Sequence, residues 1–404
     1  MFQDKIFKLK GKVQHYAWGG YEFIPHWLGI ENTEHKPYAE YWMGAHPSAP
    51  SAVCTQNGEL SLNQLIHDHH EEFIGEKVYR RFGELPFLFK ILDVKDMLSI
   101  QVHPTKAAAE AGFAAEEAAG VRLDSSFRNY KDKNHKPEVM VALSEFWLLH
   151  GFREKDSLKK ILQSVPEFEP LINIFNDGDY KALSEYTMHL PHDEVNETLT
   201  PLIQKEIQRK QNGELTKADP GWWVSKLYEN EPPEEWGNID RGVFSVYFFN
   251  IVKANPGEAV FQGAGLPHAY LEGQNVELMA NSDNVLRGGL TPKHVDVNEL
   301  LKHTIFEGIV PNVMKGERKE SGEINYPCPV PDFGISKIEL TANQDYQSTA
   351  NSLEIFVAID GSAQIKGMSK NISLKKGKAA IILAGETYHI STEDYALLYK
   401  AFVP

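Results

Sequence analysis

The chain has 404 residues, of which 42% are hydrophobic and 24% are charged, the composition of an ordinary globular protein. This length exceeds what one hydrophobic core usually supports, so we expect two or three domains. The formal charge of −15 argues against extended contact with nucleic acid or an anionic membrane, because both need a basic surface. Any phosphate group must therefore be bound by local basic residues.

Targeting and cysteine content indicate the compartment. The first twenty residues show no apolar core ahead of a small-residue cleavage site, and no run approaches 18 apolar residues. We therefore predict a cytoplasmic protein. Cys54 and Cys328 lie far apart and form no CxxC motif, so a disulfide framework and a zinc knuckle are excluded, and each is interpreted as a buried structural thiol.

Residues 1–150 consist mainly of short extended segments and turns. PFLFKILDV and LSIQVH are predicted strands, and the segment PTKAAAEAGFAAEEAAG that follows them is a predicted helix. In LSIQVH the polar residues Ser99, Gln101 and His103 alternate with apolar residues, so their side chains share one face of the strand. In HKPEVMV the same period places Lys136 and Glu138 on a common side. Imidazole, carboxylate and amide oxygen are all ligands for a divalent ion such as zinc.

The stretch from about residue 152 to 236 has a helical pattern. Apolar residues between 158 and 165 recur at i, i+3, i+4 and i+7, which is typical of a helix buried on one side. Thr200 and Pro201 are predicted as the N-cap and first position of another helix. We interpret residues 152–236 as a helical insertion.

Strand signals return after a turn-rich segment that ends near residue 242. The expected strands include VFSVYFFNIV, EAVFQ, GAGLPHAYLEG and VELMA. Apolar residues alternate from 353 to 359, ahead of a turn predicted at Asp360-Gly361. The pattern predicts a mainly β protein in which residues 1–151 and 237–320 form one domain and residues 321–404 another.

Two β segments resemble each other weakly. PGEAVFQGAGLPHAY and KGKAAIILAGETYHI each have a turn glycine, a strand, a second glycine and a histidine. Gly257 and His268 are 11 residues apart, whereas Gly377 and His389 are 12 apart, and a one-residue slip turns a strand side chain to the other face. We infer two related β-barrels, the second without a metal site; chance likeness of two hairpins is the alternative.

His268 is predicted to complete the ligand set, because it begins a segment dense in polar groups. Two histidines, one glutamate and Gln101 carry one negative charge against a dication, which leaves the metal electrophilic and favours a catalytic site. A single histidine is more often a surface or core residue, so the hypothesis depends on the convergence of the four. The cluster His67, His69 and His70 is interpreted as a solvated helix face without a role.

Basic residues close to these segments predict a phosphorylated substrate. Arg287 lies beside paired glycines that let a ligand approach the backbone, and Lys293 follows six residues later. With Lys90, Lys136 and Ser99 they supply the donors that a phosphate needs, although each alone is more commonly a surface residue.

Several long motifs carry a family resemblance, among them VQHYAWGG, AEYWMGAHPSAPS, LSIQVHPTKAAAEAGF, NYKDKNHKPE and HAYLEGQNVELMANSDNVLRGGLTPKHVDV. The chain resembles the type I mannose-6-phosphate isomerases, which are zinc-dependent cupin enzymes, over most of residues 10–300. The resemblance implies one zinc ion held by Gln101, His103, Glu138 and His268. It further implies Arg287, Lys136 and Asp283 as catalytic candidates and a substrate pocket that includes Ser99, Lys90, Glu277 and Lys293.

One departure from the family is visible beside the arginine. The family usually has Arg-Ala-Gly, whereas this chain has Arg287-Gly288-Gly289, which loosens the backbone there. This puts the efficiency of the enzyme in doubt rather than its identity.

The resemblance implies a fold and an activity as well. The expected architecture is a cupin-type jelly-roll catalytic barrel interrupted by an α-helical domain and followed by a second jelly-roll domain. The expected reaction interconverts mannose 6-phosphate and fructose 6-phosphate through an enediol. The proton-transferring group stays open between Lys136, Asp283, Glu277 and zinc-bound water. A metal-dependent cupin oxygenase and a non-catalytic sugar-phosphate-binding protein are the alternatives, and a monomer is expected.

Overall fold

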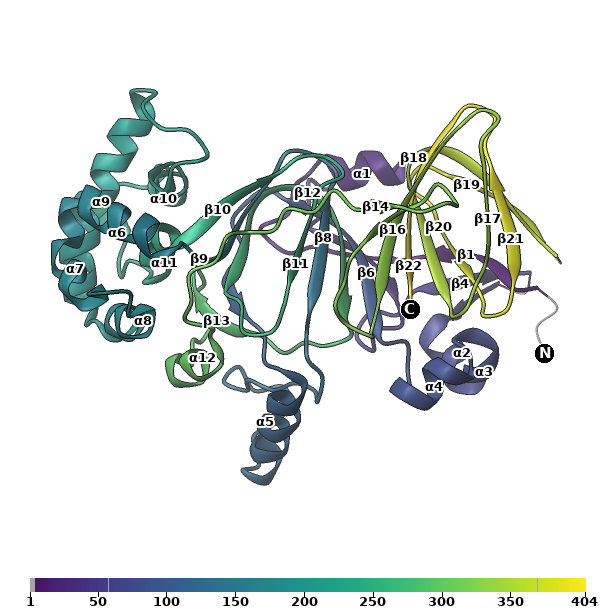
Figure 1. Cartoon of the computed structure of the whole chain (residues 1–404), viewed down its shortest axis with the longest axis horizontal. Coiled ribbons are helices and arrows are strands. Elements are labelled where there is room, and N and C mark those ends of the chain that lie inside the picture. The colour runs from purple at the N-terminus through teal and green to yellow at the C-terminus, as the bar shows by residue number, and fades with distance from the viewer. Residues whose placement is uncertain (1–3, 57, 369) are drawn as a thin grey trace.

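The computed structural model describes residues 4–56, 58–368 and 370–404. A β-barrel lies at the centre of the molecule, with a helical domain on one side and a second, C-terminal barrel on the other (Figure 1). This arrangement confirms the predicted mainly β fold with two jelly-roll barrels and a helical insertion.

The central barrel is built around one long strand, β12 (His268–Ala280), which pairs with β6, β7, β8 and β9. Tyr270 of this strand belongs to an apolar cluster with Leu92, Val94 and Met140 of neighbouring strands, which forms part of the interior. The metal-binding candidates lie at strand ends beside this interior. The other strands of the barrel are β2 (Lys12–Gln14), β3 (Glu40–Gly44), β6 (Phe87–Val94), β7 (Ile100–Val102), β8 (Glu138–Ala142), β9 (Phe146–Phe152), β10 (Phe249–Ala254), β11 (Ala259–Gln262) and β13 (Leu286–Gly289).

The helical domain follows β9 and is inserted before β10. Its elements are α6 (Lys155–Ser164), η1 (Pro166–Phe168), α7 (Glu169–Phe175), α8 (Tyr180–His189), α9 (His192–Gln211), α10 (Pro220–Tyr228), η2 (Pro233–Glu235) and α11 (Gly242–Phe248). Helix α6 confirms the helix predicted from the spacing at 158–165.

Two predictions in this region are wrong. Helix α9 runs through Pro201 rather than starting there, because buried Leu199 and Leu202 hold the backbone helical on both sides of the proline. Residues 242–248 form α11 instead of a strand. This segment is buried on all sides in the core of the helical domain, so its apolar run has no period that distinguishes helix from strand.

The other helices lie outside the helical domain. Helix α5 (Lys106–Ala118) confirms the predicted Ala/Glu-rich helix, and its N-cap Thr105 accepts a hydrogen bond from the backbone N–H of Ala108. The remaining helices are α1 (Phe23–Leu28), α2 (Leu62–Asp68), α3 (His70–Phe73), α4 (Glu76–Phe82) and α12 (Val297–His303).

The C-terminal barrel includes strands from the start of the chain. Strand β1 (Ile6–Lys10) pairs with β20 (Ala379–Ile382) on one side and with β4 (Ala52–Thr55) on the other, and β4 pairs with β5 (Gly58–Ser61) (Figure 1). One sheet thus joins segments that the predicted boundaries assign to the first and last domains; the division into 1–151 with 237–320, 152–236 and 321–404 stays a prediction. The other strands are β14 (Glu317–Arg318), β15 (Ile324–Tyr326), β16 (Gly334–Thr341), β17 (Asp345–Thr349), β18 (Glu354–Gly367), β19 (Asn371–Lys375), β21 (Thr387–Ser391) and β22 (Tyr395–Phe402).

The turn predicted at Asp360-Gly361 is wrong. Strand β18 continues through both residues, with a bulge between Ala358 and Asp360 in its pairing with β22. Gly361 has φ 69°, a backbone conformation that favours glycine, so the Asp360-Gly361 pair bends the long strand at the bulge and does not end it.

The two barrels share the predicted repeat. Gly257 and Gly377 both have positive φ, as do Gly265 and Gly385, eight residues later in each case. Counting from these glycines, the counterpart of His268 is Tyr388 and not His389. Tyr388 is buried, whereas His389 is partly exposed and pairs with Asp345. The one-residue slip therefore turns the histidine of the second barrel outward.

Strand register extends this correspondence to the glutamates. Glu138 lies opposite Gln262 in the first barrel, and Glu354 lies opposite Ile382 in the second. Gln262 and Ile382 each follow the equivalent turn glycine of their barrel by five residues. Glu354 accepts a hydrogen bond from the Tyr388 hydroxyl (2.6 Å). Lys400 Nζ is 3.8 Å from Glu354 and 2.9 Å from Glu323. The second barrel thus keeps the glutamate position and places an ammonium group next to it.

Candidate metal centre

Three buried side chains meet at one end of the central barrel. His103 directly follows β7, Glu138 begins β8 and His268 begins β12. One ligand atom from each of the three lies within 4.8 Å of the other two. The three residues are 0%, 4% and 3% exposed, so their polar atoms need partners inside the protein.

Backbone carbonyls fix the tautomers of both histidines. His103 Nδ1 lies 2.9 Å from the carbonyl oxygen of Asn284, and His268 Nδ1 lies 2.9 Å from that of Leu266. A carbonyl only accepts, so each Nδ1 carries the proton and each Nε2 is left with its lone pair, 3.4 and 3.2 Å from the oxygens of Glu138, an arrangement of acceptors that a cation would bridge. Among the described residues His103 Nε2 has no hydrogen-bond partner.

The histidine and glutamate charges suit a metal ion. Burial, assisted by the nearby ammonium of Lys136, lowers the pKa of His103 to about 4, so its imidazole is neutral at pH 7. Burial alone would raise the pKa of Glu138, but Lys136, at 2.6 Å, and His103 hold it well below its ordinary value. A neutral imidazole and an ionised carboxylate are the forms that bind zinc. The unpartnered Nε2 and this donor set therefore fit a zinc ion.

A second buried cluster lies beside the ligands. Lys90 Nζ is 3.3 Å from Glu40 and 3.1 Å from Glu277, and it lies 5.2 Å from the ring centre of Trp42. Burial acts to lower the pKa of Lys90, but the two carboxylates outweigh it and raise the pKa. For Glu277, burial dominates and raises the pKa, with Lys90 opposing and Glu138 adding to the shift. Lys90 thus stays charged next to a carboxyl group that binds a proton readily.

Both clusters face one small cavity of about 60 Å³. The cavity carries three carboxylates and two ammonium groups, a formal charge of −1 that a dication would change to +1. Its lining residues are Glu40, Lys90, Leu92, Leu98, Gln101, Lys136, Glu138, His268, Ala269, Tyr270 and Glu277. This space accommodates a metal ion and the reacting end of a small substrate.

Gln101 lies on β7, the strand that pairs with both β12 and β13 beside the site. It lies opposite His268 in the β7–β12 pair and opposite Arg287 in the β7–β13 pair. Its side chain lines the cavity with Glu138 and His268, as the alternation in LSIQVH predicted. The sheet therefore places an amide between the ligands and the arginine.

Arg287 and Asp283 lie at the edge of the site. Arg287 is half-buried, burial lowers its pKa, and no described carboxylate forms an ion pair with it. Asp283, whose side chain is 55% exposed, lies 3.4 Å from His46 Nε2, and this contact lowers the pKa of the carboxyl group. The rim thus offers one unpaired guanidinium and one carboxylate that is ionised at neutral pH.

The remaining predicted residues lie outside the cavity. Ser99 precedes β7 and Lys293 lies on the exposed loop after β13; neither is among the described residues that line the cavity. His67, at an exposed helix position, pairs with Asp68, and the partly buried His70 stacks on Tyr79. Cys54 and Cys328 are free thiols.

Sequence reasoning missed three residues of the site. Glu40 and Trp42 lie two residues apart on β3, so their side chains share one face of the strand. A carboxylate on the same buried face as a tryptophan indicates a residue that points into the barrel. Tyr270 follows His268 by two residues and faces the same way, and its hydroxyl donates to Gln262 (3.3 Å). Asn284 acts through its backbone carbonyl, for which the sequence gives no signal.

Known proteins resemble the chain in sequence and structure. Residues 6–155 match the family described as phosphomannose isomerase type I, catalytic domain. The mannose-6-phosphate isomerase of Escherichia coli (strain K12) is 41% identical over 384 residues, which cover 94% of this chain and 95% of that protein. The mannose-6-phosphate isomerase of Rattus norvegicus is 34% identical over 423 residues, with 96% and 95% covered.

Solved structures agree with this likeness. A zinc-bound mannose 6-phosphate isomerase superposes with a TM-score of 0.88 at 35% identity, covering 99% of this chain and 100% of that one. A mutant of phosphomannose isomerase from Salmonella typhimurium gives the same TM-score, identity and coverage. None of the helices in the described part of the chain has the length and apolar content that a membrane span needs.

Proposed function

Because this chain belongs to the type I mannose-6-phosphate isomerase family, we propose that it interconverts D-mannose 6-phosphate and D-fructose 6-phosphate with one zinc ion. The observation that carries the proposal is the His103–Glu138–His268 cluster, which shares a cavity with Lys136 and the Lys90–Glu277 pair. Neither a cupin oxygenase nor a non-catalytic binding protein is favoured, because relatives that match over 94% of the chain carry the isomerase name.

The proposed zinc ligands are Gln101, His103, Glu138 and His268. When bound, zinc would polarise substrate oxygens and stabilise the negative charge that develops on them as the enediol forms. The protein's part is to present imidazole Nε2 atoms and an ionised carboxylate. The backbone carbonyls orient the two histidine rings, and the Lys136–Glu138 contact keeps the carboxylate ionised. The formal charge of the cavity then becomes positive, which suits an anionic substrate.

Proton transfer between C1 and C2 needs a base within reach of the reacting carbons. Lys136 and Glu277 line the cavity, whereas Asp283 lies on its exposed rim. The pKa of Glu277 is raised by burial, which brings a carboxyl group closer to the operating pH, and that of Asp283 is lowered. We therefore propose Glu277 and Lys136 as candidate bases inside the cavity and Asp283 as a candidate base at its exposed rim.

The phosphate group lies outside the small cavity in this proposal. Arg287 is a half-buried cation with no ion pair to a carboxylate among the described residues, and it lies opposite Gln101 in the β7–β13 pair, so it would bind the phosphate or the developing charge. Ser99 and Lys293 stay proposed substrate contacts from the resemblance, with positions next to the β7–β13 pair.

A coupled assay on mannose 6-phosphate, with and without a chelator, tests the function. We expect conversion that the chelator abolishes and zinc restores. His103→Ala is expected to lose metal and activity together, whereas Arg287→Ala is expected to keep zinc and lose turnover. Absence of chelator-sensitive conversion would overturn the proposal, and normal turnover by Arg287→Ala would remove that residue's role. We also propose a cytoplasmic monomer, which sedimentation of the purified protein and cell fractionation would test.

A further inference from the structure

Asn284 is a fully buried residue in the loop that connects β12 to β13. Its side-chain oxygen accepts hydrogen bonds from the backbone N–H groups of Lys131 (2.7 Å) and Asp132 (3.2 Å). Its side-chain nitrogen donates to the backbone oxygens of Asp132 (2.9 Å) and Asn134 (2.8 Å). Both donors and both acceptor sites of the amide are therefore used, a pattern that only an amide can supply.

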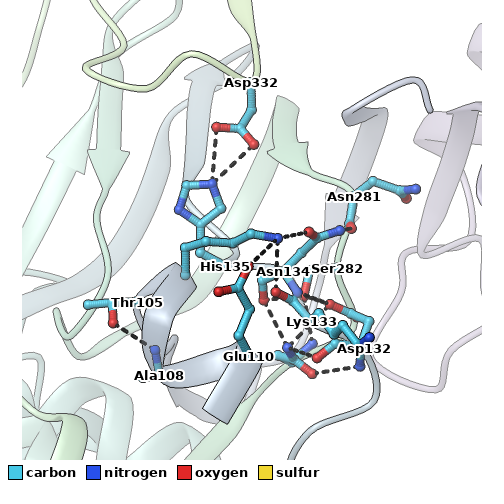
Figure 2. A network of polar contacts seen from close by, with 12 residues as sticks. Thr105, Ala108, Glu110, Asp132, Lys133, Asn134, His135, Asn281, Ser282 and Asp332 are labelled. Atoms are coloured by element: carbon cyan, nitrogen blue, oxygen red, sulfur yellow. Dashed lines mark hydrogen bonds and ion pairs between the residues drawn. The ribbon is translucent and has the colours of Figure 1, made fainter. Parts of the chain in front are cut away.

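These bonds clamp the β12–β13 loop to the loop that precedes β8. Asp132 reinforces the clamp, because its carboxylate accepts from the Ser282 hydroxyl (2.9 Å) and from the backbone N–H of Asp283 (2.7 Å). Figure 2 shows Asp132, Asn134 and Ser282 gathered beside the start of α5, with His135 directed away from them toward Asp332. The first loop leads to Arg287 and the second to Lys136.

The same residue also orients a metal ligand. The backbone oxygen of Asn284 is the acceptor for His103 Nδ1, at 2.9 Å, and His103 is completely buried. The position of this carbonyl decides which ring nitrogen carries the proton, and hence whether Nε2 presents a lone pair. Because the side chain of Asn284 fixes the loop, it also fixes its own carbonyl.

We infer that Asn284 is a positioning residue that sets the tautomer of His103 and holds the Lys136 segment in register with it. The inference rests on the proposed isomerase function only for its turnover readout. Zinc affinity and the protonation pattern of His103 belong to the protein itself. A protein with no isomerase activity would overturn the proposed function, while these two measurements would still decide the role of Asn284.

The test compares Asn284→Ala, the milder Asn284→Ser and a control, Asn196→Ala. Asn196 also bridges two segments through its amide, donating to the oxygen of Gly237 (3.0 Å) and accepting from the N–H of Ile239 (3.0 Å), but it lies in the helical domain. Zinc affinity is measured by competition with a fluorescent chelator. The ¹⁵N signals of the His103 ring in zinc-free protein are assigned by their loss in His103→Gln.

We expect both Asn284 variants to bind zinc about 10- to 100-fold more weakly, the range for loss of an outer partner of a metal ligand. The His103 signals should shift from a single Nδ1-protonated form to a mixture, and kcat should stay low at saturating zinc. The control should keep the zinc affinity, tautomer and kcat of the parent even if its melting temperature falls. Native zinc affinity with an unchanged His103 tautomer in Asn284→Ser, or in a folded Asn284→Ala, would overturn the inference.

Discussion

Replacing Lys90 by methionine would test how much the buried charge cluster depends on one ammonium group. Methionine preserves the length of the side chain and removes its charge. The variant would leave Glu40 and Glu277 buried next to each other without the cation that now lies 3.3 and 3.1 Å from them. We expect a large loss of stability that depends on pH.

The magnitude follows from these distances. Two unit charges about 3.2 Å apart attract by about 5 kcal/mol at an effective dielectric constant of about 20, before the cost of burial is subtracted. Breaking a buried ion pair by removing one partner costs about 3–5 kcal/mol, because the remaining charge is left uncompensated. Such a loss is a large part of the roughly 5–15 kcal/mol that stabilises a typical domain.

The sign of the pH dependence follows from Glu277. Its pKa in the folded protein is already raised by burial, and loss of Lys90 would raise it further. A carboxyl group with a raised folded pKa destabilises the protein as pH rises from its unfolded pKa through its folded pKa. The deficit of Lys90→Met relative to the parent is therefore expected to be largest near about pH 8 and smaller near about pH 5.

Denaturant unfolding of the zinc-free proteins at several pH values would measure this deficit, since the pH dependence of zinc binding then plays no part. Lys10→Met is the matched control, because Lys10 lies 3.1 Å from Glu59 but both side chains are more than half exposed. Its loss should stay within about 1 kcal/mol. Equal losses in the two variants, or a Lys90→Met deficit that grows toward acid pH, would refute the reasoning.

Three further predictions concern the rest of the molecule. Lys400→Met is expected to destabilise the C-terminal barrel by about 3 kcal/mol, because Glu354 loses its cation, with one zinc per chain retained; urea unfolding and metal analysis would check both. Pro201→Ala is expected to stabilise α9 by about 1–3 kcal/mol by restoring an interior N–H, measured as a shift of the urea midpoint. Chelation should lower the melting temperature of the central barrel in calorimetry, and zinc should restore it without substrate.

Local patterns predicted several side chains that line the cavity. Alternation in LSIQVH placed Gln101 on the inner face, where it lines the cavity with Glu138 and His268. Period two is a property of any strand, so the sequence alone fixes which side chains share a face. It does not fix which strands become neighbours, and the Glu40–Lys90–Glu277 cluster arises from three strands that are far apart in the chain.

Elements defined by long-range contacts escaped prediction for the same reason. Strand β1 pairs with β20, more than 360 residues away, and a sequence pattern contains no information on such a partner. The helix at residues 242–248 gave no helical signal in the sequence, because a segment buried on nearly every side is apolar throughout and shows no periodicity. Asn284 stayed hidden because its contact with His103 is made by a backbone atom.

The two barrels each bury a glutamate at the same position, Glu138 in the first and Glu354 in the second, and a comparison of their partners shows what stabilises such a carboxylate. In the first barrel Glu138 lies beside two histidines whose Nε2 atoms suit a metal, and Lys136 supplies a positive charge. In the second, Tyr388 and Lys400 contact Glu354, so a cation of the protein itself lies beside the carboxylate. A carboxylate in either interior is stable only next to positive charge. Both barrels place a lysine beside the glutamate, so the difference lies in the other partners: Tyr388 donates a hydrogen bond to Glu354, whereas His103 Nε2 beside Glu138 keeps a lone pair that is free for an ion.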